Sequence, residues 1–100
     1  MDAVSAQECG MDADTWQVQR YFEIVEGLAS GEPLSAIGKR QGITGSRVRQ
    51  IGQKACRYYR QSQSGDLTMD GSWQSRVAMS LIQTKSISIR RWLDENASSD

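Results

Sequence analysis

The sequence contains no histidine, one proline and two cysteines among its 100 residues. Without histidine, the chain has no imidazole to act as a general base, to form a Ser-His-Asp or Cys-His arrangement, or to bind a metal. Cys9 and Cys56 are too far apart in sequence to read as a zinc-binding pair, and two free thiols are typical of a reducing compartment. The glycine-rich phosphate loops GxxxxGK[ST] and GxGxxG are also absent. We therefore expect neither an enzyme nor a protein that carries a metal or another cofactor.

Long apolar stretches are missing as well. No run approaches the ~18 apolar residues that a transmembrane helix needs. The N-terminal sequence MDAVSAQECGMDAD is acidic and lacks the apolar centre of a signal peptide. These two features predict a cytoplasmic protein with no membrane partner.

The 12 basic and 12 acidic residues cancel over the whole chain, but they are unevenly distributed. Residues 1–32 carry seven acids and one base, residues 33–64 carry seven bases and no acid, and residues 65–100 carry five acids and four bases. The middle segment is thus a local positive feature. It is either a solvated basic face or a surface that faces phosphates, and the charge pattern alone does not decide between them.

Apolar residues recur at intervals of three and four along most of the chain, which predicts helices. We expect an acidic, disordered tail over residues 1–12, followed by helices over residues 14–30, 34–41, 45–61 and 72–83. Gly42 can adopt the positive φ that often ends a helix, and Thr44 can cap the next one. Residues 13–61 would then form a three-helix domain, followed by a C-terminal helical segment over residues 72–96.

The pattern over residues 86–96 fits two structures. Ile87 and Ile89 alternate with serines, which is typical of a strand, whereas Ile89, Trp92 and Leu93 have helical spacing. We favour the helix, and therefore an all-α fold.

Residues 34–60 have the layout of a helix-turn-helix: a short helix, a turn that contains Gly42, and a longer basic helix. In such a unit the second helix enters the major groove of DNA. Exposed arginine and glutamine side chains can form paired hydrogen bonds with base edges, and further cations can contact phosphates.

The stretch LSAIGKRQGITGSRVRQIGQKACR (residues 34–57) resembles region 4 of the sigma-70 family of bacterial transcription initiation factors. That family has the turn I-G-K-R-x-G-V-T, followed by a basic helix. The matching positions are Ile37, Gly38, Lys39, Arg40, Gly42, Thr44, Arg47, Arg49, Gln50, Ile51, Lys54, Ala55 and Arg57. The resemblance covers about a quarter of the chain and implies a helix-turn-helix that binds double-stranded DNA.

Two departures from the family are informative. The family has arginine and glutamate after the threonine, where this chain has Gly45 and Ser46, so the resemblance implies a target other than the usual −35 promoter element. Gly52 stands where the family has an acid. Each glycine in a helix costs about 1 kcal/mol relative to alanine. Two glycines in this helix therefore suggest that its backbone closely approaches another group, or that the helix becomes fully ordered only on binding.

The motif and the expected exposure together predict three groups of residues. Base edges are expected to contact Arg49, Gln50 and Ser46. Phosphates are expected to contact Lys39, Arg40, Thr44, Arg47, Lys54 and Arg57. Contacts in the core or in a dimer are expected for Trp73, Val77, Leu81, Ile89, Trp92 and Leu93.

A single helix-turn-helix reads few base pairs, so we expect a homodimer. A helix-turn-helix followed by a pairing segment is similar in layout to KorA-type plasmid repressors. We therefore expect a DNA-binding transcription regulator of bacterial, phage or plasmid origin, and a repressor rather than an activator. The alternative is a mimic of sigma region 4 that binds RNA polymerase and modulates transcription through protein contacts.

Overall fold

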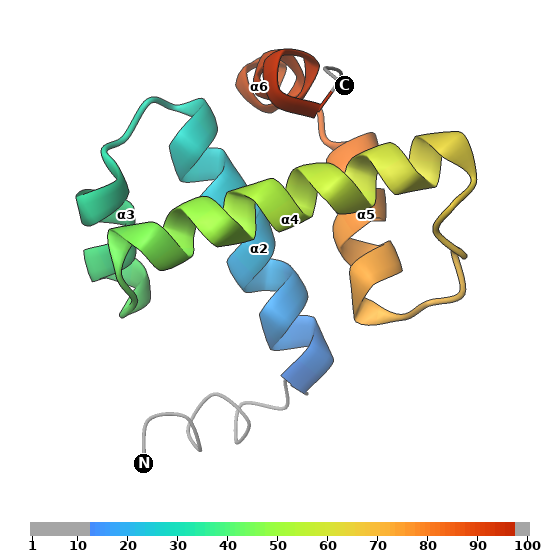
Figure 1. Cartoon of the computed structure of the whole chain (residues 1–100), viewed down its shortest axis with the longest axis horizontal. Helices are drawn as coiled ribbons and strands as arrows, with labels where there is room; N and C mark the ends of the chain where they lie inside the picture. The colour runs from blue at the N-terminus through green and yellow to red at the C-terminus, as the bar shows by residue number, and fades with distance from the viewer. Residues whose placement is uncertain (1–12, 98–100) are drawn as a thin grey trace.

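A computed structural model describes residues 13–97 as an arrangement of helices, with no strand in that range (Figure 1). The helices are α2 (Ala13–Ala29), α3 (Leu34–Gln41), α4 (Gly45–Ser64), α5 (Trp73–Gln83) and α6 (Ile87–Ala97). The expected all-α fold is confirmed. The segment that fitted a strand or a helix is the helix α6. The tail expected over residues 1–12 lies outside the described residues.

The ends of α3 and α4 follow the local chemistry of the sequence. Gly42 ends α3 in the left-handed region, with φ of 74°, and Thr44 caps α4 by accepting a hydrogen bond from the backbone N–H of Arg47. Helix α4 continues to Ser64, three residues beyond the predicted end, and stops at Gly65, where φ is 86°. Nothing between Gln61 and Gly65 prevents a helix, because the intervening residues are serine and glutamine.

One hydrophobic core joins all five helices. Its fully buried side chains come from α2, α3, α4, α5 and α6, and they include Tyr21, Ile24, Ile37, Val48, Ile51, Leu81, Ile89 and Leu93. Helix α4 lies across α2, with α3 at one end and α5 near the other, and α6 lies beside it (Figure 1). The C-terminal segment is therefore part of the same core as α2, α3 and α4.

An aromatic cluster packs α5 against α2 and α4. The ring of Trp73 meets Tyr21 and Tyr58 edge to face, with centroids 5.3 and 5.7 Å away. Such edge-to-face pairs add to the stabilisation that comes from burying the rings. Trp73 thus has a structural role within the single chain.

Among the described residues, no helix combines the length and the apolar character needed to cross a membrane.

Candidate nucleic-acid interface

Helix α4 has one face in the core and one face in solvent. Val48, Ile51 and Ala55 are at most 1% exposed. The three residues expected to read bases, Ser46, Arg49 and Gln50, are all exposed on the first two turns of the helix. The structure therefore brings these three candidates together on the N-terminal half of α4.

Hydrogen bonds order the first turn of α4. The hydroxyl oxygen of Thr44 accepts from the backbone N–H of Arg47 at 3.1 Å. The Arg47 guanidinium in turn donates to the amide oxygen of Gln50 at 3.4 Å. The Gln50 oxygen has two lone pairs, so it can still accept a second hydrogen bond from a ligand, and its NH₂ group can donate one. Arg47 and Gln50 therefore form a connected pair on the exposed face.

The two basic residues at the end of α3 differ in their surroundings. Lys39 is exposed, whereas the Arg40 guanidinium forms an ion pair with the Glu32 carboxylate at 2.7 Å. Both side chains of the pair remain partly in solvent, at 50% and 36% exposure. Arg40 is thus partly neutralised by its own chain, which makes it a weaker candidate for phosphate contact than Lys39.

Arg20, which the sequence did not single out, extends the positive surface from α2. Its guanidinium donates to the backbone carbonyl of Gln41 at 3.2 Å and lies 4.2 Å from the centre of the Trp16 ring. Partial burial, and then the nearby charge of Arg47, lower the pKa of Arg20. Arg20 therefore belongs to the electrostatic surroundings of the start of α4. The signal in the sequence is that it is the single base among residues 1–32.

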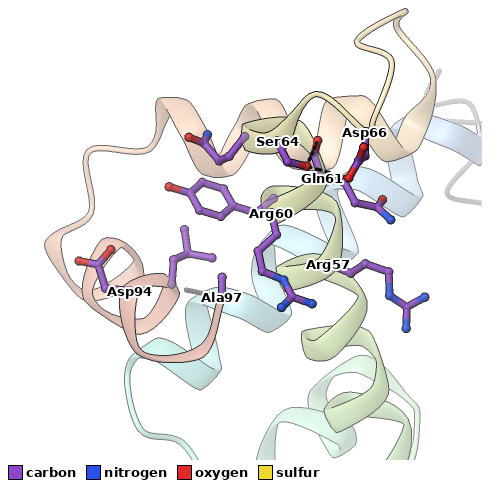
Figure 2. Close-up of a pocket in the computed structure, with 10 residues that line it drawn as sticks. Arg57, Arg60, Gln61, Ser64, Asp66, Asp94 and Ala97 are labelled. Carbon is purple, nitrogen blue, oxygen red and sulfur yellow. Dashed lines mark hydrogen bonds between the residues drawn. The ribbon is translucent and has the colours of Figure 1, made fainter. Parts of the chain in front are cut away.

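The C-terminal half of α4 has a different character. Lys54 is half-buried. Arg57 and Arg60 line a groove of about 640 Å³ between α4 and α6, and Asp66 and Asp94 also line it (Figure 2). These carboxylates oppose the approach of a phosphate near Arg57. The surface most favourable to a polyanion therefore extends from Lys39 to Lys54.

The six residues expected in the core or in a dimer lie in the core or against it. Four of them are at most 2% exposed: Val77, Leu81, Ile89 and Leu93. Trp73 and Trp92 are half-buried and pack on the same core. The four buried side chains have no surface to offer a second copy, so any dimer contact must involve other residues.

Gly52 is buried, and its close neighbours belong to the same chain. A Cβ on Gly52 would lie 2.6 Å from Leu28 Cδ1 in α2 and 3.9 Å from the ring of Trp92 in α6. The close approach that the sequence suggested for this glycine is therefore explained by packing within the chain. Cys56, one turn later, is 7% exposed, and burial raises the pKa of its thiol to about 11.

No protein-family model matches the chain, and neither a curated protein nor a solved structure is significantly similar to it.

Proposed function

We propose that this protein is a sequence-specific DNA-binding transcription regulator, a repressor, in which α3 and α4 act as a helix-turn-helix. The observation that carries the proposal is the exposed face of α4, where Ser46, Arg49 and Gln50 stand on the turns nearest the helix N-terminus. In helix-turn-helix proteins this part of the second helix contacts base edges. Arg49 would pair with guanine and Gln50 with adenine, the bases whose edges those side chains fit.

The surrounding charges support a polyanion as the partner. Residues 33–64 carry seven bases and no acid. Lys39, Arg47 and Arg49 are exposed, and Arg20 adds a cation beside Arg47. Such contacts would set the position of the DNA, while the base contacts would supply the specificity.

Selection of bound DNA from a random library tests the proposal. We expect an enriched sequence, and two half-sites about 10 base pairs apart if the protein binds as a dimer. Arg49→Ala should weaken binding to the selected site by about 1–3 kcal/mol and relax the preference at one base position. Arg91→Ala is the matched control, because Arg91 is also an exposed arginine but lies on α6 in a groove with Leu28 and Ile87.

Two outcomes would contradict the proposal. If Arg49→Ala binds the selected site as well as the parent does, Arg49 does not read a base. If no sequence is enriched while RNA polymerase core enzyme retains the protein, the chain acts as a sigma region 4 mimic through protein contacts.

A further inference from the structure

A second groove lies alongside α4 and differs from the one in Figure 2. It has a volume of about 490 Å³, within the range of small-molecule sites. Its apolar lining comes from α2, α3, α4 and α6, and comprises Leu28, Leu34, Gly52, Cys56 and Trp92. Gly52 lets Leu28 pack closely against α4 in the wall of this groove, because a Cβ there would lie 2.6 Å from Leu28 Cδ1. The groove thus offers an aromatic ring and two leucine side chains to a flat apolar group.

The polar groups that line this groove include no carboxylate. They are two arginines, Arg49 and Arg60, and the neutral amides Gln53 and Asn96. Three other grooves formed by the described residues combine arginine with acids. Asp66 and Asp94 accompany Arg57 and Arg60, which lines both grooves; three glutamates accompany Arg40, and Glu95 accompanies Arg91. The groove beside Gly52 is therefore the one among these four that suits an anion.

The side chain of Arg49 is the cation best placed to meet that anion. It is exposed, and it makes no ion pair or hydrogen bond with the rest of residues 13–97. A carboxylate can accept two parallel hydrogen bonds from a guanidinium. The amide of Gln53, from the next turn of α4, can donate to the same group. An apolar wall and a donor pair at its edge are the elements of a site for an aromatic acid.

We infer that this groove binds a small aromatic carboxylate, with the ring against Trp92 and Leu28 and the carboxylate on Arg49. The inference rests on the proposed function in one respect, since Arg49 is also the residue proposed to read DNA. A bound acid would occupy the Arg49 guanidinium and compete with the base for it. The ligand would then act as an inducer that releases the protein from its operator.

Titration of the ¹⁵N-labelled protein with 2-naphthoate, in the absence of DNA, tests the site directly. The chain has three tryptophans, Trp16, Trp73 and Trp92, and Trp92 is the one that lines this groove. We expect saturable shifts of the Trp92 indole N–H and of the Gly52 and Gln53 amides. The indole signals of Trp16 and Trp73 serve as internal controls and should not move.

A pair of charge-matched variants tests the role of the anion. Gln53→Glu places a carboxylate in the groove and should weaken 2-naphthoate binding roughly fivefold through charge repulsion. Gln63→Glu adds the same charge to α4 in the groove of Figure 2 and should leave binding unchanged within about twofold, as its distance from the site implies. Both positions are exposed, so both variants should fold.

The outcomes separate this inference from the proposed function. Absence of saturable shifts at Trp92, or equal weakening by both glutamate variants, would overturn the groove site and leave DNA binding untouched. Binding of 2-naphthoate by a protein that enriches no DNA sequence would overturn the proposed function and leave the groove site standing. Release of the selected DNA by 2-naphthoate, retained in Gln63→Glu and weakened in Gln53→Glu, would support both.

Discussion

Gly38 of α3 packs directly against the backbone carbonyl of Ile43. A Cβ on Gly38 would lie 2.5 Å from the Ile43 oxygen and 3.1 Å from the carbonyl carbon of Thr44. The backbone N–H of Ile43 also donates to the carbonyl of Gly38 at 2.8 Å. The turn therefore folds back onto this one position of α3, and its backbone occupies the space that a side chain would need. This contact holds the turn before α4 against α3.

We predict that Gly38→Ala destabilises the protein by about 1–3 kcal/mol, the usual cost of overpacking. Alanine gains about 1 kcal/mol over glycine in a helix, but here the obstructing atoms are backbone atoms, which cannot rotate away. Gly52→Ala is the control, because its closest obstacle is the end of the Leu28 side chain. It should change the free energy of unfolding by no more than ~1 kcal/mol, the helix gain offsetting the movement of Leu28. Urea unfolding followed by circular dichroism measures both, and equal effects would refute this account of Gly38.

The ion pair between Glu32 and Arg40 makes a prediction about salt dependence. If about four phosphates are neutralised, log K should fall with log salt concentration with a slope near −3.6. Lys39→Gln should reduce the magnitude of that slope by about 0.9, the share of one phosphate contact. Arg40→Gln should reduce it by clearly less, because Glu32 already holds this guanidinium.

Binding isotherms on the selected DNA at four or five salt concentrations would measure the slopes. A larger effect of Arg40→Gln than of Lys39→Gln would show that DNA displaces Glu32 and recruits Arg40. In that case Glu32→Gln would leave the salt slope of the parent protein unchanged, because Arg40 would already contact a phosphate.

The helices could be predicted from the sequence because their causes are local. The spacing of Val48, Ile51 and Ala55 marks the buried side of α4 whatever lies beneath it. Gly42 and Thr44 determine the turn through their own backbone and hydroxyl chemistry. The predicted end of α4 was three residues early, because a polar sequence without proline or glycine gives no definite stop before Gly65.

The features that sequence reasoning missed depend on residues that are distant in the chain. The position of Arg20 near Arg47 requires that α2 lie across the start of α4. The neighbours of Gly52 come from residues 24 positions before it and 40 positions after it. The helical spacing of Ile89 and Leu93 predicted that both side chains are buried. Whether they are buried in the core or in a dimer could not be predicted, because it depends on how α6 packs on α2 and α4.

The buried thiol of Cys56 makes a prediction about pH. Burial raises its pKa from 9.0 to about 11, so the folded protein holds the neutral thiol where the unfolded chain would begin to ionise. The stabilisation from this group is complete below pH 9 and is lost as the pH rises through about 11. The free energy of unfolding should therefore fall between these values more steeply with Cys56 than without it.

The measurement compares Cys9→Ser with Cys9→Ser/Cys56→Ala, so that Cys9 does not contribute. Tyr21, whose pKa burial also raises, titrates in both proteins and cancels in the difference. The difference in free energy of unfolding between the two proteins should be constant up to pH 9 and then shrink as the pH approaches 11. A difference that stays constant throughout would mean that Cys56 keeps the pKa of a solvated thiol, and that α2, α4 and α6 do not exclude water from it.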